Sequence, residues 1–338
     1  MLEKIVVLLD GSTLAKTVLP HARALAGAFQ ARITLLHVLE PQKKPDTGRL
    51  DPLNWHLRKI EAQSFLDAVA QEGENEGMAI NTILLEGTAA RSIVEYLDET
   101  EPDLIMLSSH GQGGLSPWNV SSVAQKIIYR VFRSFMLVRA YQHAGEEADE
   151  VRYGRIAVPL DGSKRAEYTL PFAARLAEAH DAELVLLHAL TPPPVMQRHT
   201  LTAEETAVID RLSERNQAEA EQYLNQIADQ QSPQTMARCL SGPSAADVLL
   251  DFVNNEENGI DLVIMSAHGY SSETIRPYGS VVSSFIAYGS TTLLILQDLA
   301  QDEIRPTQAE LSVAASRGNG RIRQTNAYAQ PADWSSEE

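Results

Sequence analysis

Two short motifs contain the residues best suited to binding a ligand, and each motif occurs twice. Asp-Gly-Ser stands at residues 10–12 and again at residues 161–163, while a motif that ends in His-Gly stands at residues 108–111 and again at residues 266–269. Each motif follows a short apolar run, which places its polar groups where a strand would end. Ligands of open parallel sheets bind outside the carboxyl ends of the strands, so these four segments are the first candidates for a binding site.

The second His-Gly motif leads to a further feature. Nine residues separate Gly269 from an amphipathic segment that opens with Gly279, Ser280 and Val281. Small residues at a helix start leave backbone N–H groups facing outward, and the positive end of the helix dipole adds to their attraction for an anion. A carboxylate across the cleft, Asp161, suits the hydroxyls of a ribose. Phosphate and ribose together indicate a nucleotide, although both motifs are also ordinary turn and N-cap sequences.

The composition of the 338-residue chain narrows the classes of function. The chain has 28 Lys and Arg against 45 Asp and Glu, a formal net charge of -17, so sequence-independent binding of nucleic acid is not expected. The single cysteine, Cys239, excludes an internal disulfide and a cysteine-ligated zinc site. We expect a cytoplasmic protein without a membrane span, because no apolar run reaches the roughly 18 residues of a span and the N-terminal one is too short for a secretory signal.

Internal repetition organises the chain. Residues 4–12 match residues 155–163 at an offset of 151, and residues 103–111 match residues 261–269 at an offset of 158. The offset grows between the matched segments, so the extra residues fall between shared elements. The matches therefore predict two copies of one domain.

These copies set the expected domain boundaries. The first half covers residues 1–143 and the second half covers residues 152–300, and a polar junction lies between them. Residues 301–338 fall outside the repeat, are polar and show no sustained period, so we expect a flexible tail.

Each half alternates short apolar runs with longer amphipathic segments. The runs of the first half, rich in β-branched residues, are at residues 5–9, 33–39, 80–85, 104–108 and 135–138. Such runs are typical of buried parallel strands. Strands that alternate with helices favour right-handed crossovers and a sheet covered on both faces. The sequence therefore predicts an α/β protein with two tandem, doubly wound, Rossmann-like domains, each with a five-stranded parallel sheet.

At these residues the chain resembles the universal stress proteins, in the tandem form with two such domains. Nucleotide-binding members of that family have G, two residues, G, nine residues and then G followed by S or T. The second half has Ser266, two residues, Gly269, nine residues and then Gly279 followed by Ser280. The resemblance implies a sheet ordered 3-2-1-4-5, ATP with Mg2+ across the ends of strands one and four, dimerisation through strand five, and a stress-response role without a defined reaction.

The family pattern, carried over residue by residue, implies a nucleotide site in each half. In the second half its residues are Pro159, Asp161, Ala189, Met265, Ser266, Gly269, Gly279, Ser280 and Val281. In the first half they are Leu8, Asp10, Val38, Leu107, Ser108, Gly111, Ser121, Ser122 and Val123. The second half is expected to hold the better site, because Ser121 stands where the family has its last glycine and its Cβ hinders close approach of a phosphate.

Several polar residues outside this pattern receive no role in binding. His37, His110, His188 and His268 have no carboxylate at ligand spacing, so they are interpreted as scaffold and no metal site is predicted. Arg276 either reaches a phosphate or is a solvated loop cation. No catalytic residue is assigned.

The expected function is that of a cytoplasmic stress-response protein that binds ATP, mainly in the second half, as a regulatory or signalling ligand. The two halves are expected to pack as an intramolecular pseudo-dimer, a further homodimer is left open, and neither nucleic acid nor a membrane is an expected partner. One alternative is an interaction or scaffold protein without nucleotide. Another is a weak ATPase with Asp161 and His268 as the acid–base pair.

Overall fold

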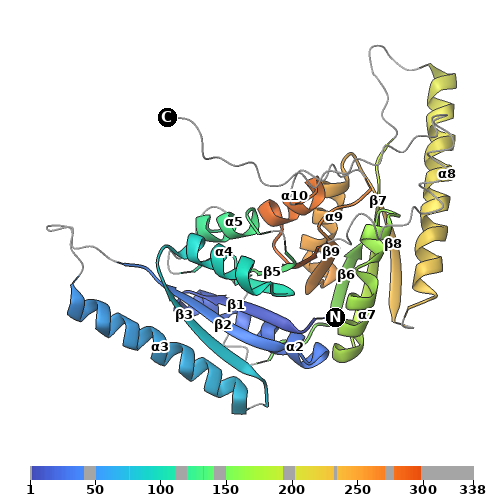
Figure 1. The fold of residues 1–338 in the computed structure, drawn as a ribbon. Helices are drawn as coiled ribbons and strands as arrows, with labels where there is room; N and C mark the ends of the chain where they lie inside the picture. Colours follow the sequence, from blue (N-terminus) through green and yellow to red (C-terminus); the bar gives the residue numbers. More distant parts are fainter. Residues whose placement is uncertain are drawn as a thin grey trace, which may run out of the picture.

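One sheet runs through the whole molecule. The computed structural model describes residues 2–41, 51–75, 77–111, 120–131, 133–140, 150–192, 202–231, 234–270 and 278–297. Within these residues, ten strands follow the order β3-β2-β1-β4-β5-β10-β9-β6-β7-β8 (Figure 1). Each half contributes its five strands in the order 3-2-1-4-5, as the resemblance implied.

The first half alternates strands and helices along the chain. Its elements are β1 (Lys4–Leu9), α1 (Thr13–Lys16), α2 (Val18–Phe29), β2 (Arg32–Leu39), α3 (Pro52–Asn75), β3 (Ile80–Glu86), α4 (Ala89–Thr100), β4 (Leu104–Ser108), α5 (Ser122–Ile128) and β5 (Phe135–Val138). Strands β1 to β5 pair in parallel, so each helix crosses over one face of the sheet. The five predicted strands are confirmed, with ends that differ by a residue or less.

The second half repeats this order. Its elements are β6 (Arg155–Pro159), α6 (Lys164–Glu167), α7 (Leu170–His180), β7 (Glu183–Leu190), α8 (Ala203–Ala228), β8 (Thr235–Ser241), α9 (Ala245–Asn254), a short 3-10 helix (Glu256–Asn258), β9 (Leu262–Ser266), α10 (Ser280–Tyr288) and β10 (Thr292–Leu296). The predicted boundaries of the domains stay a prediction, and the predicted tail at residues 301–338 lies outside the described residues.

Strand side chains alternate between two buried layers. Ile5, Val7 and Leu9 of β1 belong to one cluster, whereas Val6 and Leu8 belong to the other. Helices α2, α3, α7 and α8 cover the first face of the sheet, and α4, α5, α9 and α10 cover the second (Figure 1). A strand that is buried on both faces needs a continuous apolar sequence, which explains the runs of Ile, Val and Leu.

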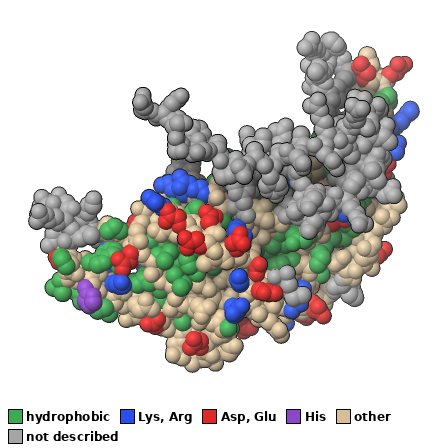
Figure 2. Space-filling model, in the orientation of Figure 1, with side chains coloured by type: hydrophobic (Ala, Val, Ile, Leu, Met, Phe, Trp, Pro, Cys, Tyr) green, Lys and Arg blue, Asp and Glu red, His purple; other side chains and the backbone are tan. Residues whose placement is uncertain are grey.

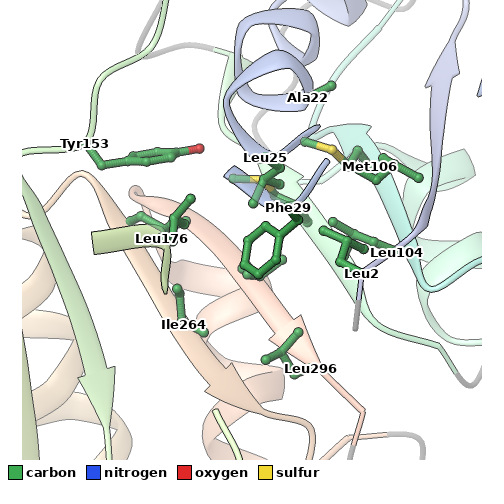
Figure 3. Packing of buried hydrophobic residues seen from close by; sticks show 14 of the residues in the cluster. Leu2, Ala22, Leu25, Phe29, Leu104, Met106, Tyr153, Leu176, Ile264 and Leu296 are labelled. Atoms are coloured by element: carbon green, nitrogen blue, oxygen red, sulfur yellow. The ribbon is translucent and has the colours of Figure 1, made fainter. Parts of the chain in front are cut away.

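The two halves join through their fifth strands. β5 pairs with β10 in the antiparallel direction, with Leu137 opposite Leu293. The core continues across this junction, since Phe29 of α2 and Leu176 of α7 lie in the same buried cluster as Leu296 of β10 (Figure 3). The halves therefore form an intramolecular pseudo-dimer with a shared core.

The surface carries charges of both signs. On the face shown in Figure 2, Lys and Arg side chains lie among Asp and Glu side chains rather than in one block. Some of them form ion pairs, such as Arg133 with Glu101 at 2.9 Å. None of the described helices combines the length and the apolar character that crossing a membrane requires.

Candidate functional site

A cavity of about 800 Å³ opens in the second half, at the carboxyl ends of β6, β7 and β9. A volume of this size suits a small-molecule ligand. The first turn of α10 and one side of α9 complete its wall. All the second-half residues of the predicted site line this one cavity, namely Pro159, Asp161, Ala189, Met265, Ser266, Gly269, Gly279, Ser280 and Val281.

Asp161 follows β6 and faces the end of the neighbouring strand β9. Its Oδ1 accepts hydrogen bonds from the backbone N–H of Ser163 at 3.0 Å and from the hydroxyl of Ser163 at 2.6 Å. Its Oδ2 accepts one from the backbone N–H of Tyr270 at 2.6 Å. A carboxylate offers about four acceptor positions, so this one ties two strand ends together and retains capacity for a further donor.

The start of α10 is open toward the cavity. Gly279 is the N-cap, with φ of -67° and ψ of 169°, and has no side chain with which to accept from the first turn. Its own N–H donates to the carbonyl of Ala267 at 2.8 Å. The first-turn N–H groups of a helix have no intrahelical acceptor, so those of residues 280–282 are available at the edge of the cavity. The arrangement is suited to an anion.

The first half has the same backbone and a different cap. Ser121, the equivalent of Gly279, has φ of -64° and ψ of 155°, and its N–H donates to the carbonyl of Ser109 at 2.7 Å. Its hydroxyl accepts from the N–H of Ala124 at 3.3 Å. A side chain therefore satisfies a donor of α5, whereas no side chain among the described residues caps the equivalent donor of α10.

The other predicted residues of the first half occupy equivalent strand ends. Leu8 and Asp10 lie at the end of β1, Val38 near the end of β2, Leu107, Ser108 and Gly111 at the end of β4, and Ser122 and Val123 at the start of α5. Residues 112–119 and 271–277, and Arg276 with them, lie outside the described residues.

Sequence reasoning did not assign several residues of the cavity wall to the site, among them Tyr278, Ala245 and Leu249. Tyr278 directly precedes Gly279 and is buried, and Ala245 and Leu249 come from α9. The motif spacing treated Tyr278 as loop. The α9 residues gave no local signal, because only the packing of α9 beside α10 brings them to the site.

Two of the repeated histidines bind backbone carbonyls. Nδ1–H of His188 donates to the carbonyl of Leu160 at 2.8 Å, and Nδ1–H of His37 donates to that of Leu9 at 2.8 Å. Each ring thus fixes the end of the first strand of its half against the second. In the part of the chain that the structure describes, no group of three or more His, Cys, Asp and Glu side chains is placed to hold a metal ion.

Comparison with known proteins bears on both halves. The model of the universal stress protein family matches residues 1–139 and again residues 152–297. A universal stress protein of Methanocaldococcus jannaschii is 30% identical over 141 residues, which cover 40% of this chain and 82% of that protein. A second, from Bacillus subtilis, is 26% identical over 137 residues, which cover 38% of this chain and 92% of that protein.

Solved structures extend the likeness over nearly the whole length. A functionally unknown protein of Pseudomonas aeruginosa has a TM-score of 0.62 at 16% identity and covers 94% of this chain and 98% of its own. A universal stress protein of Archaeoglobus fulgidus has a TM-score of 0.58 at 18% identity, with 87% and 98% covered. At this identity the structures show the fold alone. The two matches to the family model show that the chain belongs to the universal stress protein family and carries two of its domains in tandem.

Proposed function

We propose that the second half binds an adenine nucleotide, with ATP as the preferred one, and that its occupancy is a regulatory signal in a cytoplasmic stress-response protein. The phosphates lie at the start of α10, and the base lies toward Ala189 at the end of β7. A ligand of this kind shifts the protein toward the state that it binds more tightly, and this is how occupancy becomes a signal.

One observation carries the proposal, namely the difference between the starts of α10 and α5. Gly279 leaves the first turn of α10 without a side-chain cap at the edge of a cavity of about 800 Å³, whereas the hydroxyl of Ser121 caps α5. Serine is a better N-cap than glycine, so the stability of α10 alone does not explain Gly279. A glycine at position 279 is explained if an anionic ligand accepts hydrogen bonds from the first-turn N–H groups of α10.

The remaining wall suits the other parts of a nucleotide. Met265, Leu249 and Ala189 present apolar surface, which favours an aromatic base. Asp161 has acceptor capacity for a ribose hydroxyl beyond its bonds to Ser163 and Tyr270. The cavity thus offers apolar surface, an acceptor and an anion-binding helix start.

The net charge of -17 opposes binding of a triphosphate at long range. Screening limits that repulsion to about 10 Å at ordinary ionic strength, whereas the N–H groups of α10 act in direct contact. Mg2+ that accompanies ATP is held largely by phosphate oxygens and water, so it needs few protein carboxylates. This fits a cavity whose one acidic side chain among the described lining residues is Asp161.

Isothermal titration of the full chain with ATP, beside the variant Gly279→Ser, tests the proposal. The variant is expected to fold, because a Cβ at position 279 would lie 3.5 Å from the carbonyl oxygen of Ala267, an ordinary contact. We expect binding by the wild type and a loss of about tenfold in the variant, the size of a lost anion–helix interaction. Absence of heat at millimolar ATP would overturn the proposal in favour of a scaffold role, and equal binding by the variant would place the nucleotide elsewhere.

A further inference from the structure

The carboxyl end of α10 is held by a side chain from the other half. Arg139 directly follows β5 and is 0% exposed. Its Nη2 donates to the carbonyl of Phe285 at 2.7 Å and to that of Ile286 at 3.2 Å. Both carbonyls belong to the last turns of α10, where a cation stabilises a helix. Arg139, a residue of the first half, thus binds the carboxyl end of α10, and the amino end of this helix borders the cavity.

Tyr278 holds the start of the same helix. Its hydroxyl lies 3.0 Å from the carbonyl of Ile128 and 3.2 Å from that of Val131, both in the first half. The side chain is 2% exposed and packs edge-on against Phe135, with ring centroids 5.3 Å apart. Burial raises the pKa of Tyr278, so the hydroxyl keeps its proton and acts as a donor. Both ends of α10 are therefore fixed from the first half.

The internal repeat does not reproduce this pair. At the offset of 158, Gln297 stands where Arg139 does and Val120 stands where Tyr278 does. Glutamine carries no charge and valine has no hydroxyl. Arg139 thus places a buried cation at the carboxyl end of α10, the helix whose first turn has no side-chain cap. The repeat gives α5 no equivalent cation.

We propose that Arg139 is a positioning residue that determines the specificity of the second-half site for anionic ligands, an inference that rests on the proposed function. The guanidinium is permanently charged. It lies behind a helix of nine residues, roughly 13 Å in length, and in line with the dipole of that helix. A buried charge at this distance is weakly screened. The residue holds α10 in place and raises the positive potential at its start, so the site favours ligands according to their negative charge.

Hydrogen exchange of the ligand-free full chain tests whether Arg139 holds α10. The variants are Arg139→Met, which removes the charge, and Arg139→Lys, which keeps it. Arg133→Met is the matched control, because it removes the same charge from a surface ion pair with Glu101. We expect faster exchange at residues 280–288 in Arg139→Met, partial rescue in Arg139→Lys, and no change in the control or in the central strands. Unchanged exchange in Arg139→Met would overturn the positioning role.

Binding of adenosine, AMP and ATP tests the specificity role with the same variants. In Arg139→Met we expect adenosine affinity to change by less than about twofold, AMP affinity to fall about threefold to tenfold, and ATP affinity to fall further, since the interaction scales with ligand charge. An equal loss for all three ligands, or no loss, would overturn the specificity role. If the wild type binds none of them, the nucleotide function and the specificity role are both wrong, while the exchange experiment still decides whether Arg139 holds α10.

Discussion

The carboxylate of Asp161 lies directly against Gly269, where any Cβ on residue 269 would overlap its Oδ2. The first half repeats this relationship between Asp10 and Gly111. Asp161 cannot turn aside without losing its bonds to Ser163 and Tyr270. The glycine of each His-Gly motif is therefore required by the packing of two neighbouring strand ends, whether or not a ligand is bound.

Replacing Gly269 by alanine is predicted to destabilise the fold, because the added methyl displaces Asp161. The expected loss in the free energy of unfolding is about 1–3 kcal/mol, the usual cost of overpacking. Denaturant unfolding measures it. Gly279→Ser is the control, since its added Cβ meets only ordinary contacts and serine is a good N-cap. An equal effect of the two changes would show that the overlap with Asp161 is not the cause.

Replacing Ser121 by alanine is predicted to weaken the first half without affecting the nucleotide. Loss of the N-cap hydrogen bond to Ala124 is expected to lower the free energy of unfolding by about 1 kcal/mol. Titration with ATP is expected to give the wild-type affinity, since the proposed site lies at α10. A loss of ATP affinity in this variant would move the site, wholly or in part, to the first half.

Much of the fold could be predicted from the sequence because the same pattern of strands and motifs occurs in both halves. The offset of the repeat matched the segment that ends before Asp10 with the segment that ends before Asp161. Both segments are strands in the structure. The sequence shows that Asp103 and Asp261 occupy equivalent positions, but only the structure shows what these two side chains bind. Oδ2 of Asp261 accepts from the backbone N–H groups of Gly154 and Arg155, and Asp103 does the same at the start of β1, so the repeated aspartate fixes the first strand of each half.

The contacts between the halves could not be predicted. Tyr278 reaches Ile128 across 150 residues of sequence, and Arg139 reaches Phe285 across 146. These contacts depend on the antiparallel pairing of β5 with β10, and no local sequence pattern predicts that pairing. The resemblance pointed to strand five as a dimerisation element, and the structure shows that pairing within one chain. The sequence motifs therefore predicted residues that line the cavity, whereas the contacts that depend on the pairing of β5 with β10 were not predicted.

Acid is predicted to lower the stability of the fold through His180, the last residue of α7. Burial, and then the charge of Arg152, lower the pKa of His180 below its usual 6.5. A histidine with a lower pKa in the folded state binds fewer protons folded than unfolded. Its contribution to stability is therefore complete above about pH 6.5 and is lost as the pH falls through the folded pKa.

Denaturant unfolding at pH 7.5 and at lower pH, for the wild type and His180→Gln, measures this effect. The wild type is expected to lose more stability on acidification than the variant, which cannot take up that proton. His56→Gln, at an exposed position of α3, controls for the loss of a histidine. Equal acid sensitivity of the wild type and His180→Gln would show that another group is responsible.

Calorimetric titration of the full protein with ATP gives the number of ATP molecules bound per chain, and this number distinguishes a single nucleotide site at α10 from two equivalent sites. We predict one molecule per chain, with binding weakened by Gly279→Ser and unchanged by Ser121→Ala. Two equivalent sites per chain would contradict the difference drawn between α10 and α5, and no binding at millimolar ATP would contradict the nucleotide site itself.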